Sequence, residues 1–285
     1  MKDFNYFRPL FLKEALSILS QEKAKVLAGG TDLLVKMKDG LLCPESLVDI
    51  SFLGELRFIR EEEGKIVIGT LTTHASLSKS PLINAKAPHL AEAARSIGSP
   101  LIRNIATIGG NIVNASPAGD CIPPLYTLET ELLLESIKGS RVVPIEEFFT
   151  GPGQSIIGPD ELLTAIRFKA PQEEFLAFFQ KLGQRKALAI SKVSVAFLGI
   201  YRSGGKIFEK VRIALGAVAP TVIRASTAES FLEGRFISRE VVDDVAKLCS
   251  QEAKPISDIR STQVYREKVL SELLKRGLRS MKEVV

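Results

Sequence analysis

The sequence is poor in the residues that hold metal ions and disulfides. Among its 285 residues are three cysteines, Cys43, Cys121 and Cys249, and two histidines, His74 and His89. Three widely spaced cysteines form neither a disulfide framework nor a CxxC metal motif, and an iron–sulfur cluster usually needs four cysteine ligands. We therefore expect no metal centre held by this chain alone, a buried and inert Cys121, and both histidines at the surface or in loops.

Signals typical of several other protein classes are also missing. No apolar run approaches the roughly 20 residues that span a bilayer, and the first ten residues, MKDFNYFRPL, lack the apolar core of a signal peptide. We therefore expect a cytoplasmic protein with no transmembrane segment. The absence of a GxGxxG or GxxxxGK[ST] loop disfavours a Rossmann fold and a P-loop.

Charge is unevenly distributed along the chain. Residues 1–165 carry 16 basic and 20 acidic side chains, a net −4, whereas residues 166–285 carry 22 and 13, a net +9, which together give the formal +5. A basic half can face nucleic acid, an acidic partner or an anionic ligand. No motif for binding nucleic acid accompanies it, so we expect no nucleic-acid partner. A partner-facing surface and a merely solvated basic face both remain open.

Apolar spacing and turn residues predict mixed helices and strands with a domain boundary between residues 166 and 175. Before it, helices are expected at 9–20, 72–78 and 88–97, and strands at 25–28, 47–50, 66–70, 141–144 and 162–168, with a hairpin turn at 61–64. After it, we expect strands at 175–182, 193–201 and 211–218, a hairpin turn at Ser203, Gly204 and Gly205, and helices at 227–232, 239–251 and 261–281. Three strands followed by helices indicate an antiparallel sheet covered on one face.

Two glycine pairs stand out in the first half. Gly29 and Gly30 follow a short apolar run, which predicts a strand, a tight turn and a helix or short segment that presents backbone N–H groups to an anion. A plain tight turn is the alternative. Gly109 and Gly110 interrupt a second apolar run, and the turn-rich residues after them supply polar donors. We interpret residues 107–120 as a loop around a phosphate-bearing cofactor.

The motifs around these glycines resemble those of a known family. AGGTDLL (28–34), IRNIATIGGNI (102–112) and ASPAGD (115–120) resemble the FAD-binding medium subunit of the molybdenum hydroxylases. That family includes xanthine dehydrogenase, aerobic carbon monoxide dehydrogenase, nicotinate dehydrogenase and 4-hydroxybenzoyl-CoA reductase. The resemblance continues through FFTGPG (148–153) and QKLGQRKALAISKVSVA (180–196), so it covers nearly the whole chain. The chain is too short and too poor in cysteine for the extra iron–sulfur loop of the thioester-reducing branch.

The resemblance implies an α+β fold: a two-subdomain FAD-binding domain of the vanillyl-alcohol oxidase (PCMH) type, then a small C-terminal α+β domain with a three-stranded antiparallel sheet plus helices. The expected divisions are residues 1–55 and 56–170 for the two FAD-binding subdomains. Residues 171–285 would form the C-terminal domain of the CO dehydrogenase flavoprotein type.

It also implies where FAD contacts the chain. The ADP part would be cradled by backbone groups of Leu27, Ala28, Gly29, Gly30, Thr31, Asp32 and Leu33. The pyrophosphate would be held from the other side by Thr107, Gly110 and Asn111, and the ribityl region would meet Asn114, Ser116 and Asp120. Ile97 and Val113 would sandwich the isoalloxazine ring, with Ile102 among the contacts, and Leu163 and Lys181 would lie near its edge. Lys181 would offset negative charge on a reduced flavin, or it is a surface lysine. No residue of this chain is expected to be a catalytic acid or base.

The function implied is that of an electron-transfer subunit. Substrate would be oxidised at a molybdopterin cofactor in a large partner subunit, and electrons would pass through two [2Fe–2S] clusters of a small subunit to FAD in this chain, then to NAD⁺ or another acceptor. The assembly would be a heterotrimer or its dimer. We favour a purine (xanthine-type) substrate, with carbon monoxide or an N-heterocycle such as nicotinate as alternatives. Two other hypotheses are a stand-alone FAD oxidoreductase and a basic binding module that has lost FAD.

Overall fold

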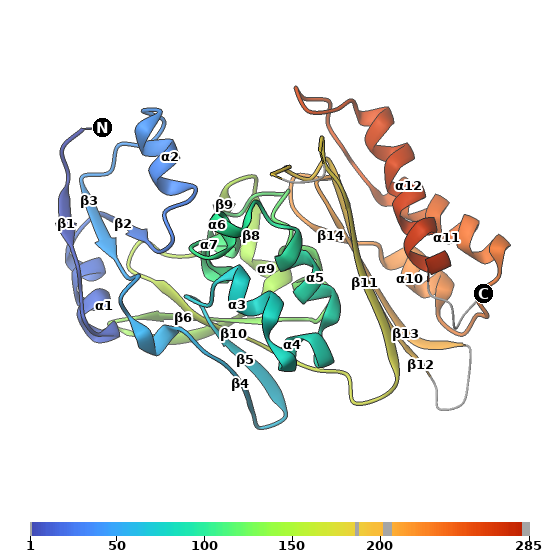
Figure 1. Ribbon diagram of the computed structural model, residues 1–285, viewed down its shortest axis with the longest axis horizontal. Helices are drawn as coiled ribbons and strands as arrows, with labels where there is room; N and C mark the ends of the chain where they lie inside the picture. Colours follow the sequence, from blue (N-terminus) through green and yellow to red (C-terminus); the bar gives the residue numbers. More distant parts are fainter. Residues whose placement is uncertain (1, 186–187, 202–206, 281–285) are drawn as a thin grey trace.

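Three larger sheets follow one another along the long axis of the molecule (Figure 1), and β8 and β9 form a small two-stranded one. The computed structural model describes residues 2–185, 188–201 and 207–280. The first sheet is built from the N-terminal residues, the second lies in the middle, and the third carries the C-terminal helices (Figure 1). The expected turn at Ser203, Gly204 and Gly205 lies outside the described residues.

The first sheet is parallel and small. Strands β1 (Asn5–Phe7), β3 (Ser46–Asp49) and β2 (Ala24–Leu27) pair in that order, with helix α1 (Leu12–Gln21) crossing between β1 and β2. Helix α1 buries Ala15, Leu16 and Leu19, which recur at helical spacing, in a core shared with Val48 of the central strand. The strand, glycine turn and helix predicted after residue 24 are confirmed, because α2 (Leu33–Lys38) begins shortly after β2.

The second sheet has five antiparallel strands, in the order β4 (Ile59–Glu62), β5 (Lys65–Gly69), β10 (Leu162–Lys169), β6 (Glu131–Ser136) and β7 (Gly139–Pro144). The predicted hairpin between β4 and β5 is confirmed, and Glu63 and Gly64 at its tip both have positive φ angles, as a two-residue hairpin turn favours. Helices α3 (His74–Lys79), α4 (Pro81–Lys86), α5 (Pro88–Ser96) and α8 (Ile122–Thr127) contribute to its core.

Short elements complete this half of the chain. They are η1 (Gly54–Leu56), α6 (Pro100–Arg103), α7 (Ile108–Val113), α9 (Ile145–Phe148), β8 (Phe149–Gly151) and β9 (Gln154–Ser155).

The third sheet is antiparallel and joins both halves of the molecule. Its order is β11 (Phe175–Leu182), β12 (Val193–Tyr201), β13 (Phe208–Gly216) and β14 (Ile223–Arg224), so a two-residue strand is added to the three expected. Alternate residues of β12 enter different cores. Val195 and Phe197 face α10 (Ser226–Leu232), α11 (Arg239–Glu252) and α12 (Gln263–Ser280), whereas Ala196 and Leu198 join the core of the second sheet. The sheet is therefore covered on both faces, not on one as expected.

Two local expectations were wrong. His74 and His89 are buried, with 1% and 0% of their surface exposed, because α3 and α5 turn them toward the core rather than toward solvent. The expected loop at residues 109–111 is instead part of helix α7. Among the described residues, no helix is both long and apolar enough to cross a membrane.

Candidate functional site

The two glycine segments lie directly against each other. A Cβ atom built on Gly29 would meet the carbonyl oxygen of Ile105 at 2.2 Å and the Cα of Ala106 at 3.0 Å. Only glycine lets the two backbones approach this closely. Gly29, just after β2 of the first sheet, and Ile105 are 76 positions apart in the chain and are therefore brought together immediately before Thr107.

The first segment presents unused backbone donors. Within the part of the chain that the structure describes, the amides of Gly29, Gly30, Thr31 and Asp32 donate to no other residue. Gly30 has a φ of +69°, a left-handed conformation that favours glycine and turns successive N–H groups toward one side. A run of free amides before a short helix has the donor chemistry that a phosphate group needs.

The second segment is a short helix with an open side. Thr107 caps α7, and its hydroxyl accepts a hydrogen bond from the Gly110 amide at 3.1 Å. This cap starts a helix despite the two glycines. A Cβ on Gly109 would lie 1.6 Å from the Thr70 hydroxyl, whereas a Cβ on Gly110 would meet only the Thr107 hydroxyl, at 3.1 Å. Gly109 is thus required by packing, and Gly110 borders accessible space.

Asn111 supplies a polar atom that the protein leaves unpaired. Its Oδ1 is buried and has no hydrogen-bond partner. Buried polar atoms are nearly always paired, so an orphaned one next to an open glycine indicates a missing partner. The free amides fit the phosphates of a dinucleotide such as FAD. The Asn111 oxygen only accepts, so it fits an N–H or O–H donor of the same molecule.

Polar side chains beyond α7 connect neighbouring segments. Asn114, the C-terminal cap of α7, accepts a hydrogen bond from Lys36 of α2 at 2.8 Å. Lys36 also pairs with Asp32 at 2.7 Å. Ser116 accepts from the amide of Ala118 at 3.3 Å, which shapes the turn that leads to α8.

A buried ion pair joins the turn before α8 to the third sheet. The Lys181 ammonium on β11 lies 2.6 Å from the Asp120 carboxylate, and their side chains are only 15% and 7% exposed. Lys181 also donates to the carbonyl of Ser96 at 2.9 Å, and the Ser191 hydroxyl donates to Asp120 at 2.6 Å. Lys181 is therefore not a surface lysine, and Ser191 is a participant that the sequence reasoning missed.

Burial controls the protonation of this cluster. Desolvation raises the pKa of Asp120 above its ordinary value, while the Lys181 ammonium and the Ser191 hydroxyl oppose that rise. Burial also raises the pKa of the Cys121 thiol well above its usual value. Cys121 is fully buried, as expected, with its sulfur 3.7 Å from Nδ1 of His74, so this thiol is not a reactive nucleophile.

The apolar residues expected at the flavin occupy different environments. Ile97 directly follows Ser96, whose carbonyl accepts from Lys181, and Ile102 lies against Gly98. Val113, at the end of α7, is 39% exposed and is available to a ligand. Leu163 is only 1% exposed and belongs to the core of the second sheet.

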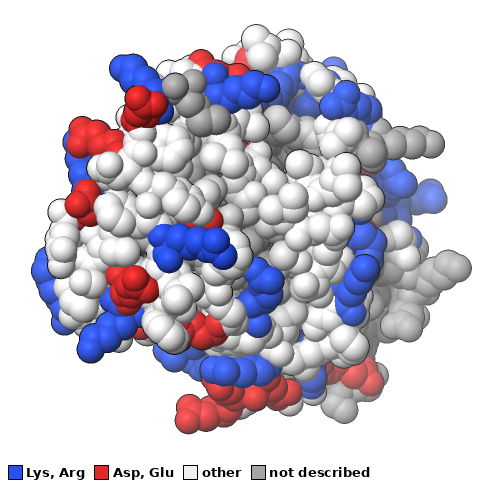
Figure 2. All heavy atoms as spheres, turned by 60° about the vertical axis from the view of Figure 1, so that its left-hand side comes forward, with Lys and Arg blue, Asp and Glu red and all other residues white. Residues whose placement is uncertain are grey.

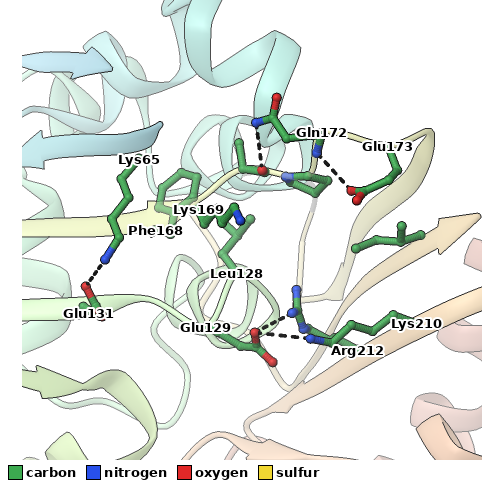
Figure 3. A pocket seen from close by; sticks show the side chains of 13 residues that line it. Lys65, Leu128, Glu129, Glu131, Phe168, Lys169, Gln172, Glu173, Lys210 and Arg212 are labelled. Atoms are coloured by element: carbon green, nitrogen blue, oxygen red, sulfur yellow. Dashed lines mark hydrogen bonds and ion pairs between the residues drawn. The ribbon is translucent and has the colours of Figure 1, made fainter. Parts of the chain in front are cut away.

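A separate cavity of about 380 Å³ lies between the second and third sheets (Figure 3). Its charged side chains are largely neutralised by one another: Lys65 pairs with Glu131 at 2.9 Å, and Glu129 pairs with Arg212 and, at 3.7 Å, with Lys210. None of the residues implicated by the glycine motifs lines it. We place the functional site at the glycine segments, because they hold the unpaired donors.

Comparisons with known proteins identify the family of the chain. Residues 2–171 match the model of the FAD binding domain in molybdopterin dehydrogenase, and residues 178–281 match the CO dehydrogenase flavoprotein C-terminal domain. The chain is 35% identical to the carbon monoxide dehydrogenase medium chain of Hydrogenophaga pseudoflava over 96% of both chains. It is 34% identical to the xanthine dehydrogenase FAD-binding subunit of Escherichia coli O157:H7, covering 97% of this chain and 95% of that subunit.

Solved structures show the same relationship. The fold superposes on carbon monoxide dehydrogenase from Hydrogenophaga pseudoflava with a TM-score of 0.93 and 34% identity, covering 99% of this chain and 98% of the other. Quinoline 2-oxidoreductase from Pseudomonas putida 86 gives 0.93 at 26% identity, covering 99% of each chain. The chain belongs to the FAD-binding medium subunits of the molybdenum hydroxylase family. It is thus the FAD-binding subunit of a molybdenum-containing oxidoreductase complex, as the sequence motifs indicate.

Proposed function

We propose that FAD is held between the two glycine segments and that the buried Asp120–Lys181 pair lies at the flavin end of the site. The observation that carries the proposal is the row of four amides at residues 29–32 that have no acceptor among the described residues, in a segment packed against Ile105 and Ala106 just before α7. The pyrophosphate would accept from these amides, with Thr107, Gly110 and Asn111 on the opposite side. Asn114 and Ser116 would face the ribityl region.

In this arrangement the bound FAD would supply the electron-transfer chemistry, and the chain's residues bind, orient and tune it. Ile97, Ile102 and Val113 would cover the ring and exclude water. The Lys181 ammonium would favour negative charge at the ring edge, and Asp120 would hold that ammonium in place. Leu163, being buried, would contribute through its backbone. No side chain here needs to exchange a proton with substrate.

We propose that electrons reach this subunit from two [2Fe–2S] clusters in a small partner subunit. Substrate oxidation would occur at molybdopterin in a large subunit, and NAD⁺ or another acceptor would take the electrons from FAD. The heterotrimer, or its dimer, is supported by the medium-chain relatives, whose names assign them to multi-subunit enzymes.

For the whole complex we propose a purine-type substrate. Its support is the 34% identity to two xanthine dehydrogenase FAD-binding subunits and the 28% identity to a caffeine dehydrogenase subunit. Relatives named for carbon monoxide and nicotinate are 35% and 31% identical, so these two substrates are the alternatives that an activity screen must include.

We propose the domain division 1–55, 56–170 and 171–285, because each part contains one of the three larger sheets. The FAD site would then lie between the first two parts, and Lys181 and Ser191 would reach it from the third. Figure 2 shows the face toward which the N-terminal side of the molecule is turned, and there the basic side chains are scattered over a broad uncharged area. The alternative of a basic binding module, which rests on the C-terminal half, predicts a protein that binds no FAD.

The experiment is purification of the tagged chain from cells that express its natural partners. We expect FAD, molybdenum and iron to co-elute in one complex, and anaerobic addition of xanthine to bleach the flavin absorbance. Carbon monoxide and nicotinate are tested in parallel. A flavin-containing chain that is fully active without partners would instead establish the stand-alone oxidoreductase.

A further inference from the structure

One lysine connects the two glycine segments across the proposed cofactor site. Lys36 lies one turn into α2, directly after the first segment. Its ammonium is 2.7 Å from the Asp32 carboxylate and 2.8 Å from Oδ1 of Asn114, which caps the end of α7. Asp32 and Asn114 are 82 positions apart, and both are proposed cofactor contacts. Lys36 lies two residues beyond the AGGTDLL motif (28–34).

We infer that Lys36 is a positioning residue that ties α2 to the end of α7 and slows the release of FAD. This inference rests on the proposed FAD site. The first segment follows β2 of the first sheet, whereas the second leads into α7, whose Gly109 amide donates to Thr70 directly after β5 of the second sheet. The contact of Gly29 with Ile105 and Ala106 also joins them. A dinucleotide bound between them leaves more slowly when a second tie resists their separation.

The ammonium is suited to this role by its geometry and its partial exposure. It has three N–H donors, of which Asp32 and Asn114 take two. The Lys36 and Asp32 side chains are 44% and 52% exposed, so solvent reaches the pair and salt screens it. The contacts of Lys36 with Asp32 and Asn114 are therefore weak enough to separate when FAD enters or leaves, and their strength depends on ionic strength.

The variant that isolates the tie is Lys36→Met, which keeps the length of the side chain and removes its charge and donors. Exposed ion pairs contribute modestly, so we expect FAD release to accelerate by about threefold to tenfold, with little change in the thermal stability of the apoprotein. Lys36→Arg should restore most of the slow release, because a guanidinium can still reach both oxygens.

Lys38→Met is the matched control. Lys38 lies on the same helix, is exposed, and has no side-chain partner within the described residues. FAD release is measured with the full chain by the rise in flavin fluorescence after dilution, at low and high salt. We expect salt to accelerate release from the wild type and Lys38→Met, and to have a smaller effect on Lys36→Met.

Equal release rates for the wild type and Lys36→Met, at both salt concentrations, would overturn the role of Lys36 while leaving the FAD site intact. A wild-type chain that binds no FAD would overturn the site and the role of Lys36 together. The two failures are thus distinguishable, because only the first leaves a yellow wild-type protein.

Discussion

The same substitution should have different effects at the two adjacent glycines of α7: it should lower stability at Gly109 and FAD affinity at Gly110. In Gly109→Ala, the new methyl group would lie 1.6 Å from the Thr70 hydroxyl and 2.9 Å from the Thr70 carbonyl oxygen. A clash this short belongs at the upper end of the cost of overpacking, about 2–3 kcal/mol or more, against about 1 kcal/mol that alanine gains over glycine in a helix. We therefore expect the apoprotein to lose about 1–2 kcal/mol or more of stability.

In Gly110→Ala, the new methyl group points toward open space and touches only the Thr107 hydroxyl, at 3.1 Å. The small adjustment of Thr107 roughly offsets the helical gain, so the stability of the apoprotein should stay within about 1 kcal/mol of the wild type. The same methyl group would occupy the approach of the pyrophosphate. We expect FAD affinity to fall at least about tenfold, a loss of about 1.4 kcal/mol, and Gly110→Val to abolish FAD retention with the C-terminal domain still folded.

Urea unfolding of the apoproteins and titration with FAD, followed by quenching of flavin fluorescence, separate the two effects. Wild-type FAD affinity in Gly110→Ala and Gly110→Val would refute the assignment of α7 to the cofactor site. Wild-type stability in Gly109→Ala would refute the packing argument.

Three further predictions concern buried groups. Asp120→Asn removes the charge that balances the buried Lys181 ammonium, so we expect a loss of about 3–5 kcal/mol in urea unfolding; a loss below about 1 kcal/mol would contradict a buried pair. Burial lowers the pKa of His89 to about 3 in the folded protein, whereas the same imidazole titrates near pH 6.5 in the unfolded chain. Below pH 6.5 the unfolded state therefore binds one more proton than the folded state. Each pH unit of acidification then lowers the free energy of unfolding by about 1.4 kcal/mol. His89→Gln should flatten this slope between pH 6.5 and 5, and an unchanged slope would show that other groups cause it. Gly277→Ala places a Cβ 2.2 Å from the Phe178 ring, so the unfolding temperature should drop by several degrees, and an unchanged value would show that α12 can shift without cost.

The sequence identified most elements of the fold because their patterns are local. Helix α1, the β4–β5 hairpin and the three long C-terminal strands each carry their own apolar period and turn residues. The sequence did not predict helix α7, because glycine has a low helix propensity and α7 contains two glycines. In the structure, the Thr107 cap and the packing of Gly109 against Thr70 stabilise the helix nevertheless.

The sequence could not say why each glycine is there. Gly29 and Gly109 are required by contacts with Ile105 and Thr70, which are distant in the chain, and only Gly110 borders open space. The glycine pairs predict that another group approaches the backbone closely at these positions. Only the structure shows whether that group belongs to the protein.

The sequence predicts side-chain partners only where the two residues stand at a spacing typical of one helix or strand. The Asp32–Lys36 pair has the i,i+4 spacing of a helical ion pair, so the sequence contained its signal. The contacts of Lys36 with Asn114 and of Asp120 with Ser191 span 78 and 71 positions, and no local pattern announces them. The burial of His74 and His89 likewise depends on how α3 and α5 pack, which composition does not reveal.

The most direct test of the central claim is the visible absorption spectrum of the purified chain, before and after incubation with FAD and, separately, with FMN. We predict flavin bands near ~370 and ~450 nm that remain with the protein through gel filtration, with FAD rather than FMN released on heating. A chain that stays colourless after incubation with FAD, both alone and together with its partner subunits, would contradict the account.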